Sequence, residues 1–188
     1  MLVSELREEL IGKVESQLQI AVESWQNLDP QVLQKQPATG GWSAAQCIAH
    51  LNFYGRYYLP AIEKALGNAR KIPNATELVF QSGWLGSYFT KLMKKDPSLN
   101  PKAKLKAPKN AVPTATPDSA KEVAEFIDHL EHLLQLLQKS SAYNVNALRI
   151  PISISPLIRL KLGDIFNFLI AHNERHIRQA ERARGIAG

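Results

Sequence analysis

One stretch decides how the chain folds: Leu162-Gly-Asp-Ile-Phe-Asn-Phe-Leu-Ile-Ala-His-Asn-Glu-Arg-His-Ile-Arg-Gln179. Its apolar residues recur at the three- and four-residue spacing that predicts an amphipathic helix. The stretch also carries His172 and His176, four positions apart. Residues at this spacing are neighbours on one helical face, so the two imidazoles can reach one divalent metal ion. A pair of ordinary histidines at the edge of a core has the same pattern, and both interpretations stay open on this stretch alone.

The composition is that of an ordinary globular protein. The chain has 188 residues, of which 45% are hydrophobic, and we expect one domain over residues 1–188. Its charged, periodic start is unlike a signal peptide, and its apolar runs are too short to span a bilayer. The single cysteine, Cys47, excludes a disulfide within the chain and a cysteine-rich zinc site. We therefore expect a cytoplasmic protein without membrane contact.

Four segments carry apolar residues at helical spacing. They are residues 4–28, 44–66, 119–139 and 162–179. Ser43 and Gln46 have the spacing of a capping box at the start of the second segment, and Ser119 and Glu122 have it at the start of the third. Pro60 lies inside the second pattern, so we expect a kink or a break there.

A long crossover separates the second and third helical segments. Residues 68–117 contain six prolines, and many of the chain's lysines lie between Lys91 and Lys109. Only residues 83–93 have a pattern that could form a short helix. A single long crossover at this place predicts an all-α four-helix bundle in which the second and third helices run parallel. Its length suggests a functional lid or a mobile segment.

The segment before the last helix gives mixed signals. Ile150-Pro-Ile-Ser-Ile154 predicts a brief extended stretch. In Ser155-Pro156, which follows, serine can cap a helix and proline can take the first helical position. Residues 157–161 are then either the start of the last helix or a turn of their own.

A third histidine, His50, falls in the second turn of the second helical segment. It lies on the side shared with Tyr54 and Tyr57, at a predicted seam between helices. Helical bundles commonly build internal metal sites from side chains on facing helices. Three imidazoles leave a fourth position open for water or substrate, as catalytic metal sites do. A seam histidine that only packs between helices is the plainer alternative.

Three motifs occur in a specific order along the chain. They are Gly41-Trp42-Ser43-Ala-Ala-Gln-Cys-Ile-Ala-His50-Leu51, Leu162-Gly163-Asp164 and His172-Asn-Glu-Arg-His176-Ile-Arg-Gln179. Between them stand Gly83-Trp84-Leu85-Gly86, Lys104-Leu-Lys-Ala-Pro-Lys109 and Ile154-Ser-Pro-Leu157. Each motif is weak alone, but their order and spacing together resemble the DinB/YfiT-like superfamily, over nearly the whole chain.

The resemblance implies a four-helix bundle, usually dimeric, with one divalent metal at the positions of His50, His172 and His176. Zinc or nickel is the first expectation for this metal, and manganese or iron is the alternative. Characterised relatives include thiol-dependent S-transferases and isomerases that use bacillithiol or mycothiol, while many members have no known reaction. The resemblance thus implies a small-molecule substrate and a low-molecular-weight thiol as a candidate partner. It does not imply DNA binding.

Other polar residues near the seam are candidates for proton transfer or substrate contact. They are Tyr54, Tyr57, Arg175 and Gln179. Interface packing also explains the tyrosines, and a surface or dimer contact also explains Arg175. Asn173 stands where the helical metalloprotease motif requires a glutamate after the first histidine, which disfavours a peptidase of that class.

Four further residues have plainer explanations than metal binding. Gln46 is explained by its capping role, and Cys47 by burial as a small hydrophobic residue. His129 and His132 lie three positions apart, but only His129 flanks the apolar stripe of its helix. We predict that both of these histidines are solvated.

The leading hypothesis is therefore a metal-dependent enzyme that acts on a small molecule by thiol transfer or hydrolysis. The alternative is a non-catalytic metal-binding or stress-response module that binds a small molecule. The net charge of +6 and the lysine-rich crossover could attract nucleic acid. Because basic and aromatic residues do not alternate there, we expect no nucleic-acid partner.

Overall fold

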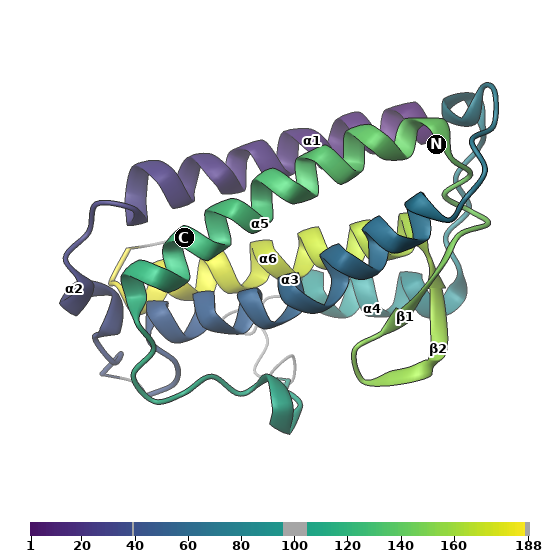
Figure 1. Ribbon diagram of the computed structural model, residues 1–188. Coiled ribbons are helices and arrows are strands. Elements are labelled where there is room, and N and C mark those ends of the chain that lie inside the picture. Colours follow the sequence, from purple (N-terminus) through teal and green to yellow (C-terminus); the bar gives the residue numbers. More distant parts are fainter. Residues whose placement is uncertain (39, 96–104, 187–188) are drawn as a thin grey trace.

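The computed structural model describes residues 1–38, 40–95 and 105–186. Four long helices lie side by side in it (Figure 1). They are α1 (Val3–Ile20), α3 (Ala44–Gly67), α5 (Ser119–Lys139) and α6 (Leu162–Ala183). α5 and α6 each pack against both α1 and α3, so the four helices enclose one apolar core. The described chain is thus mostly helical, as predicted.

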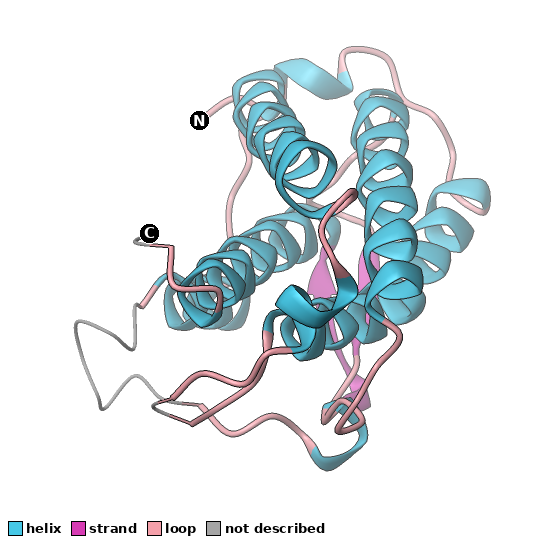
Figure 2. Ribbon diagram, turned by 90° about the vertical axis from the view of Figure 1, so that its left-hand side faces the viewer, coloured by secondary structure: helices cyan, strands magenta, loops and turns pink. Residues whose placement is uncertain are grey.

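Shorter elements complete the described part of the chain. They are the π-turn Ala21–Trp25, α2 (Pro30–Gln34), α4 (Trp84–Lys94), the 3-10 turns Ala75–Glu77, Lys109–Ala111 and Ser140–Ala142, and the strands β1 (Arg149–Ile152) and β2 (Ser155–Lys161). Figure 2 looks along the long helices and shows the two strands at their far end. No described helix is long and apolar enough to cross a membrane.

The apolar face of α6 is buried as its periodicity predicts. Leu162, Ile165, Phe166 and Leu169 are each no more than 3% exposed. Burying a side chain of this size stabilises the fold by about 1.5–3 kcal/mol. The same face carries the two histidines, so the packing that fixes α6 also fixes their direction.

The first predicted helix is shorter than its pattern. α1 ends at Ile20, and the π-turn that follows closes with a 3.0 Å hydrogen bond from Gln26 N to the carbonyl of Ala21. Within that turn Trp25 is 1% exposed, and its indole Nε1 donates to Glu181 Oε1 at 2.6 Å. The π-turn thus occurs where the Trp25 side chain is hydrogen-bonded to a residue of α6. The spacing of apolar residues within the first helical segment does not reveal this contact.

The capping box of α3 is confirmed. Ser43 Oγ accepts from Gln46 N at 3.2 Å, and Gln46 Oε1 accepts from Ser43 N at 3.0 Å. The expected kink or break at Pro60 does not divide the helix, which continues to Gly67. Pro60 is exposed, so water can bond the carbonyl that lacks its helical donor. Ser43 therefore fixes the start of the helix that carries His50.

The predicted capping box of α5 is wrong. Asp118 is the N-cap, and its carboxylate accepts from Lys121 N at 3.2 Å. Ser119 donates to the carbonyl of Pro30 instead, and the Glu122 carboxylate accepts from Asn52 Nδ2 of α3 at 2.7 Å. The hydrogen bond between Glu122 and Asn52, which is distant in the sequence, thus replaces the predicted bond between Glu122 and Ser119.

The crossover contains the predicted short helix. α4 (Trp84–Lys94) coincides closely with residues 83–93 and packs against α6 and β2. α3 and α5 run in the same direction, as a crossover of this length permits (Figure 1). Residues 96–104, in the middle of the lysine-rich stretch, lie outside the described residues.

Residues 157–161 are neither the start of the last helix nor a turn of their own, because they belong to strand β2, and the protein is not purely α-helical. β2 pairs antiparallel with β1, with Ile150 opposite Leu160. These two side chains are 0% and 5% exposed, so burial of the inner face of the hairpin outweighs the helix-start signal. Proline is tolerated because each strand of a two-stranded sheet has a free edge.

Candidate metal centre

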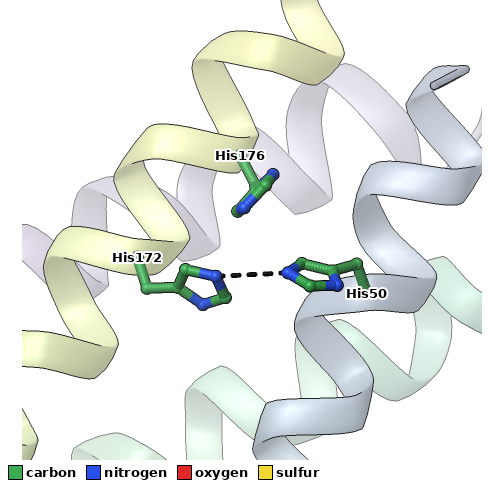
Figure 3. Close-up of side chains that lie close together, drawn as sticks. All are labelled: His50, His172 and His176. Atoms are coloured by element: carbon green, nitrogen blue, oxygen red, sulfur yellow. Dashed lines mark hydrogen bonds between the residues drawn. The ribbon is translucent and has the colours of Figure 1, made fainter. Parts of the chain in front are cut away.

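Three histidines meet between α3 and α6 (Figure 3). His50 comes from α3, and His172 and His176 come from successive turns of α6. One ring nitrogen of each lies within 4.8 Å of those of the other two. The side chains are 3%, 3% and 9% exposed, respectively. The structure thus brings together the three residues that the sequence selected.

A hydrogen bond sets the tautomer of His50. Its Nδ1 lies 2.7 Å from the carbonyl oxygen of Ala111. Because a carbonyl can only accept, the hydrogen is on Nδ1, and the lone pair is on Nε2. Nε2 faces His172 Nε2 at 3.3 Å. A backbone acceptor behind the outer ring nitrogen is the arrangement that orients histidine ligands in metal sites.

The spacing of the ring nitrogens is compatible with a metal ion. Bonds of about 2.0–2.1 Å in tetrahedral geometry separate neighbouring ligand nitrogens by about 3.3–3.4 Å. The two Nε2 atoms of His50 and His172 have this separation. Within the described residues, Nδ1 of His172 and Nδ1 of His176 are buried without a hydrogen-bond partner. An ion bound through both Nε2 atoms would leave Nδ1 of His172 on the outer side of its ring, so the spacing of the nitrogens, and not this atom, supports an ion. The cluster therefore could hold a metal ion.

Burial keeps all three imidazoles neutral. It is the main cause that lowers the pKa of His50, holds the pKa of His172 well below its usual range and brings the pKa of His176 to about 3. Repulsion from the neighbouring histidines and Arg175 lowers the pKa of both α6 histidines further. Neutral imidazole is the form that binds a metal. At neutral pH the cluster thus offers lone pairs and no charge.

Aromatic side chains hold the rings in place. His172 stacks on Phe168, with ring centroids 5.6 Å apart and planes at 10°, and its centroid lies 4.4 Å from that of Tyr54. Trp42 contacts His50 and His176, with centroid distances of 4.9 and 6.0 Å. These contacts largely shield the three rings from water.

The three histidines line a cavity of about 870 Å³. Three of the four other candidates from the sequence also line this cavity: Tyr54, Arg175 and Gln179. Burial raises the pKa of Tyr54 to about 12, so its hydroxyl stays protonated. Arg175 is 8% exposed and donates to the carbonyl of Lys95. Gln179 lies beside His176 and raises the pKa of its ring, against the larger effect of burial.

Other sequence-selected residues lie away from the cluster. Tyr57 does not line the cavity, and its hydroxyl donates to the carbonyl of Ile152 at 3.2 Å. Cys47 is fully buried, which raises the pKa of its thiol to about 12 and agrees with the small-hydrophobic interpretation. Gln46 forms the capping box and also donates to the carbonyl of Thr114. None of them joins the group of three histidines.

The prediction that His129 is solvated is wrong. Its Nδ1 lies 3.1 Å from Asn52 Oδ1, and its ring packs so closely on Gly55 that a Cβ there would be 2.4 Å from it. His132 is more exposed and lies 3.7 Å from the Glu63 carboxylate. Both belong to the polar seam between α3 and α5, away from the three-histidine cluster.

Three contributors to the site were missed in the sequence. Phe168 lies one turn before His172 on the same helical face, so the spacing of α6 could have revealed it. The carbonyl of Ala111 could not have been found, because every residue has one and only the fold selects it. The apolar side chains of α4 in the cavity wall were likewise visible only in the fold.

These observations define a mostly helical protein with a buried three-histidine cluster that could hold a metal ion. The family model described as the DinB superfamily matches residues 14–180, and the chain belongs to this superfamily. Comparison with curated proteins and with solved structures found no match.

Proposed function

We propose that the protein is a metal-dependent enzyme that acts on a small molecule at the three-histidine centre. The observation that carries this proposal is the convergence of three neutral, buried imidazoles on the wall of the 870 Å³ cavity. Pockets of about 300–1,000 Å³ are typical of small-molecule sites. His50, His172 and His176 are the proposed ligands, and three protein ligands leave a position for substrate.

Zinc or nickel is the proposed metal, and manganese or iron is the alternative. Imidazole nitrogen suits zinc, iron and nickel, so the ligand set agrees with several of these ions. A divalent metal supplies Lewis acidity, which lowers the pKa of a bound water or thiol. A metal at this site could support either thiol transfer or hydrolysis. We propose thiol transfer first, and the family resemblance supports this order.

The side chains around the cluster supply the other functions that such a site needs. The protonated hydroxyl of Tyr54 can donate a hydrogen bond to a substrate oxygen or sulfur. The Arg175 guanidinium places positive charge in the cavity wall, where it stabilises negative charge that develops on a substrate. Gln179 lies beside His176, where its amide can help to orient the ring. Asn173 Nδ2 donates a hydrogen bond to Gln17 Oε1 of α1. Its amide cannot act as the general base that the glutamate of metalloproteases provides.

A non-catalytic binding protein is the second candidate, and one observation favours it. Among the described residues that line the cavity there is no aspartate or glutamate. Carboxylates are common general bases, so their absence from this part of the wall leaves fewer groups for proton transfer. A binding module would keep the metal without needing such a group.

Metal content tests the centre directly. We expect about one divalent metal per wild-type chain and a loss of nearly all of it in His50→Ala and His172→Ala, because each removes one of three ligands. Elemental analysis of the purified proteins gives the measurement. His132→Ala is the matched control, because it removes a histidine outside the cluster. Equal metal in all four proteins would rule out the assignment.

Turnover separates the enzyme from the binding module. Metal-loaded protein should transform one of a panel of electrophiles in the presence of a cellular thiol, or hydrolyse one of a panel of esters and amides. His50→Ala should show only the background rate. Metal binding with no turnover by the wild type across the panel would favour the non-catalytic alternative.

The proposal also includes the type of helical bundle and the number of domains. The four long helices and residues 68–117 agree with one DinB-type four-helix bundle with a long crossover, in a single domain. A homodimer and a cytoplasmic location stay predictions, as does a low-molecular-weight thiol as the partner.

A further inference from the structure

One face of α6 forms a long wall of the cavity. Phe168, His172, Arg175, His176, Gln179 and Arg182 all line it. Their spacings of three and four residues place them on one side of the helix. From Phe168 to Arg182 the helix rises about 21 Å, at about 1.5 Å per residue. The polarity of this wall changes along its length, with the two histidines in the middle.

The end of the wall near Phe168 is apolar. The Phe168 ring contacts Phe89 of α4 and Tyr58 of α3, with centroid distances of 6.3 and 6.0 Å. The cavity wall contributed by α4 and the hairpin adds further apolar side chains. They are Leu92, Met93, Ile152 and Leu160. A ligand group that enters this end loses contact with water and gains contact with carbon atoms, so an alkyl or aryl group is favoured.

The other end of the wall carries positive charge. Arg182 of α6 lines the cavity at this end, Arg175 lines it between the two histidines, and Lys106 of the crossover lines it as well. No acidic residue accompanies them among the described residues of the lining. A guanidinium has five N–H donors, so each arginine can keep its protein contacts and still bind an anionic oxygen. The potential here favours an anion.

We propose that the ligand of this cavity is an amphipathic anion. Its alkyl or aryl group lies between Phe168 and Phe89, and its carboxylate, phosphate or sulfonate lies toward Arg182. The bond that reacts lies between the two, beside the three histidines. This assignment of a substrate class rests on the proposed function of the histidine centre, which supplies the reacting position.

Linear carboxylates test the two ends of the cavity on the wild-type chain. We expect affinity to rise about threefold to fourfold for each added methylene from butanoate to octanoate, because each one is buried among apolar atoms. Octanol should bind about tenfold more weakly than octanoate, because it lacks the charge. Titration calorimetry on both the metal-loaded and the chelated full-length protein gives these values.

Matched variants locate the binding within the cavity. Phe89→Ser should weaken octanoate binding about tenfold, whereas Tyr88→Ser, which changes the exposed neighbour on α4, should change it less than twofold. Arg182→Gln should weaken octanoate but not octanol. Arg178→Gln is its control, because Arg178 is absent from the described cavity lining and pairs with Glu174.

Affinity that does not depend on chain length would overturn the inference, as would equal binding of octanol and octanoate. Equal effects of Phe89→Ser and Tyr88→Ser would also overturn it, since binding would then lie on the surface of α4. The chelated protein separates this inference from the metal proposal. If the protein binds no metal but its affinity for carboxylates still rises with their chain length, the amphipathic cavity is supported and the metal proposal is wrong.

Discussion

The hydrogen bond from His50 to the carbonyl of Ala111 connects the histidine cluster to the crossover. The sequence shows three imidazoles, but only this bond shows which nitrogen of His50 carries a lone pair toward the others. At the scale of single residues the cluster is thus a set of neutral bases that the fold keeps unprotonated. That state makes the stability of the protein depend on pH.

We expect the metal-free protein to lose stability as the pH falls below about 6.5. The unfolded chain binds protons near that pH, whereas burial lowers the pKa of the folded histidines, to about 3 for His176. Between the two values the unfolded state holds more protons, so the free energy of unfolding decreases toward acid. Each such histidine contributes up to about 1.4 kcal/mol per pH unit.

Urea unfolding of the chelated protein between pH 7.5 and 5 measures this dependence. His176→Ala should make the dependence shallower, because one neutral histidine is gone. His132→Ala, which removes a more exposed histidine, is the comparison. A free energy of unfolding that stays constant over this range in the wild type would contradict the expectation.

At the scale of elements, α4 is held on α6 by a buried carboxylate. Asp164, 1% exposed, accepts from Ser82 Oγ at 2.5 Å and from Gly83 N at 2.9 Å, at the start of α4. Gly83 provides no side-chain cap of its own. Gly86, one turn later, allows this approach, because a Cβ there would lie 2.2 Å from Asp164 Cγ. The position of α4 sets the apolar end of the cavity.

Gly86→Ala should therefore destabilise the protein by about 1–3 kcal/mol, the usual cost of forcing an extra carbon into a packed site. Gly12→Ala is the matched control, because Gly12 lies in α1 with nothing within 4 Å of its added Cβ. That change should stabilise the protein by about 0.5–1 kcal/mol, since alanine favours a helix over glycine. Thermal and urea unfolding distinguish the two. Equal effects would show that α4 does not pack on Asp164 as described.

The elements also show where prediction from sequence succeeds. α3, α5 and α6 begin within one residue of the predicted positions, because helical periodicity and caps are local properties of the chain. The capping box at Ser119 and the two alternatives for residues 157–161, a helical start or a turn, failed for one shared reason. In both, a partner far away in the sequence replaced the local one: Asn52 for Glu122, and β1 for residues 155–161.

At the scale of the whole molecule, the centre joins two helices that are distant in the chain. A metal bound to both His50 and the α6 histidines would stabilise the folded state by mass action. At about 100 times the dissociation constant this amounts to about 2.7 kcal/mol. For a chain of this length, about 1 kcal/mol shifts the Tm by about 2–4 °C.

We therefore expect zinc to raise the Tm of the chelated wild-type protein by about 5–10 °C. His172→Ala should show little or no shift. Calorimetry with and without zinc gives the measurement, with calcium as the control ion because it prefers oxygen ligands. A shift of equal size in His172→Ala would mean that zinc binds elsewhere.

The sequence by itself determined the helical segments, the shared face of His172 and His176 and, through a resemblance over most of the chain, the choice of His50. These follow from the spacing of residues along the chain, which sets the face of a helix on which a side chain lies. The tertiary structure alone decided that α3 and α6 bring the three rings within reach of one ion and that a carbonyl of the crossover selects the His50 tautomer. It also placed α4 and the hairpin around the cavity. Contacts between segments distant in sequence depend on which surfaces pack together, and the spacing of residues within one segment carries no information about its partner.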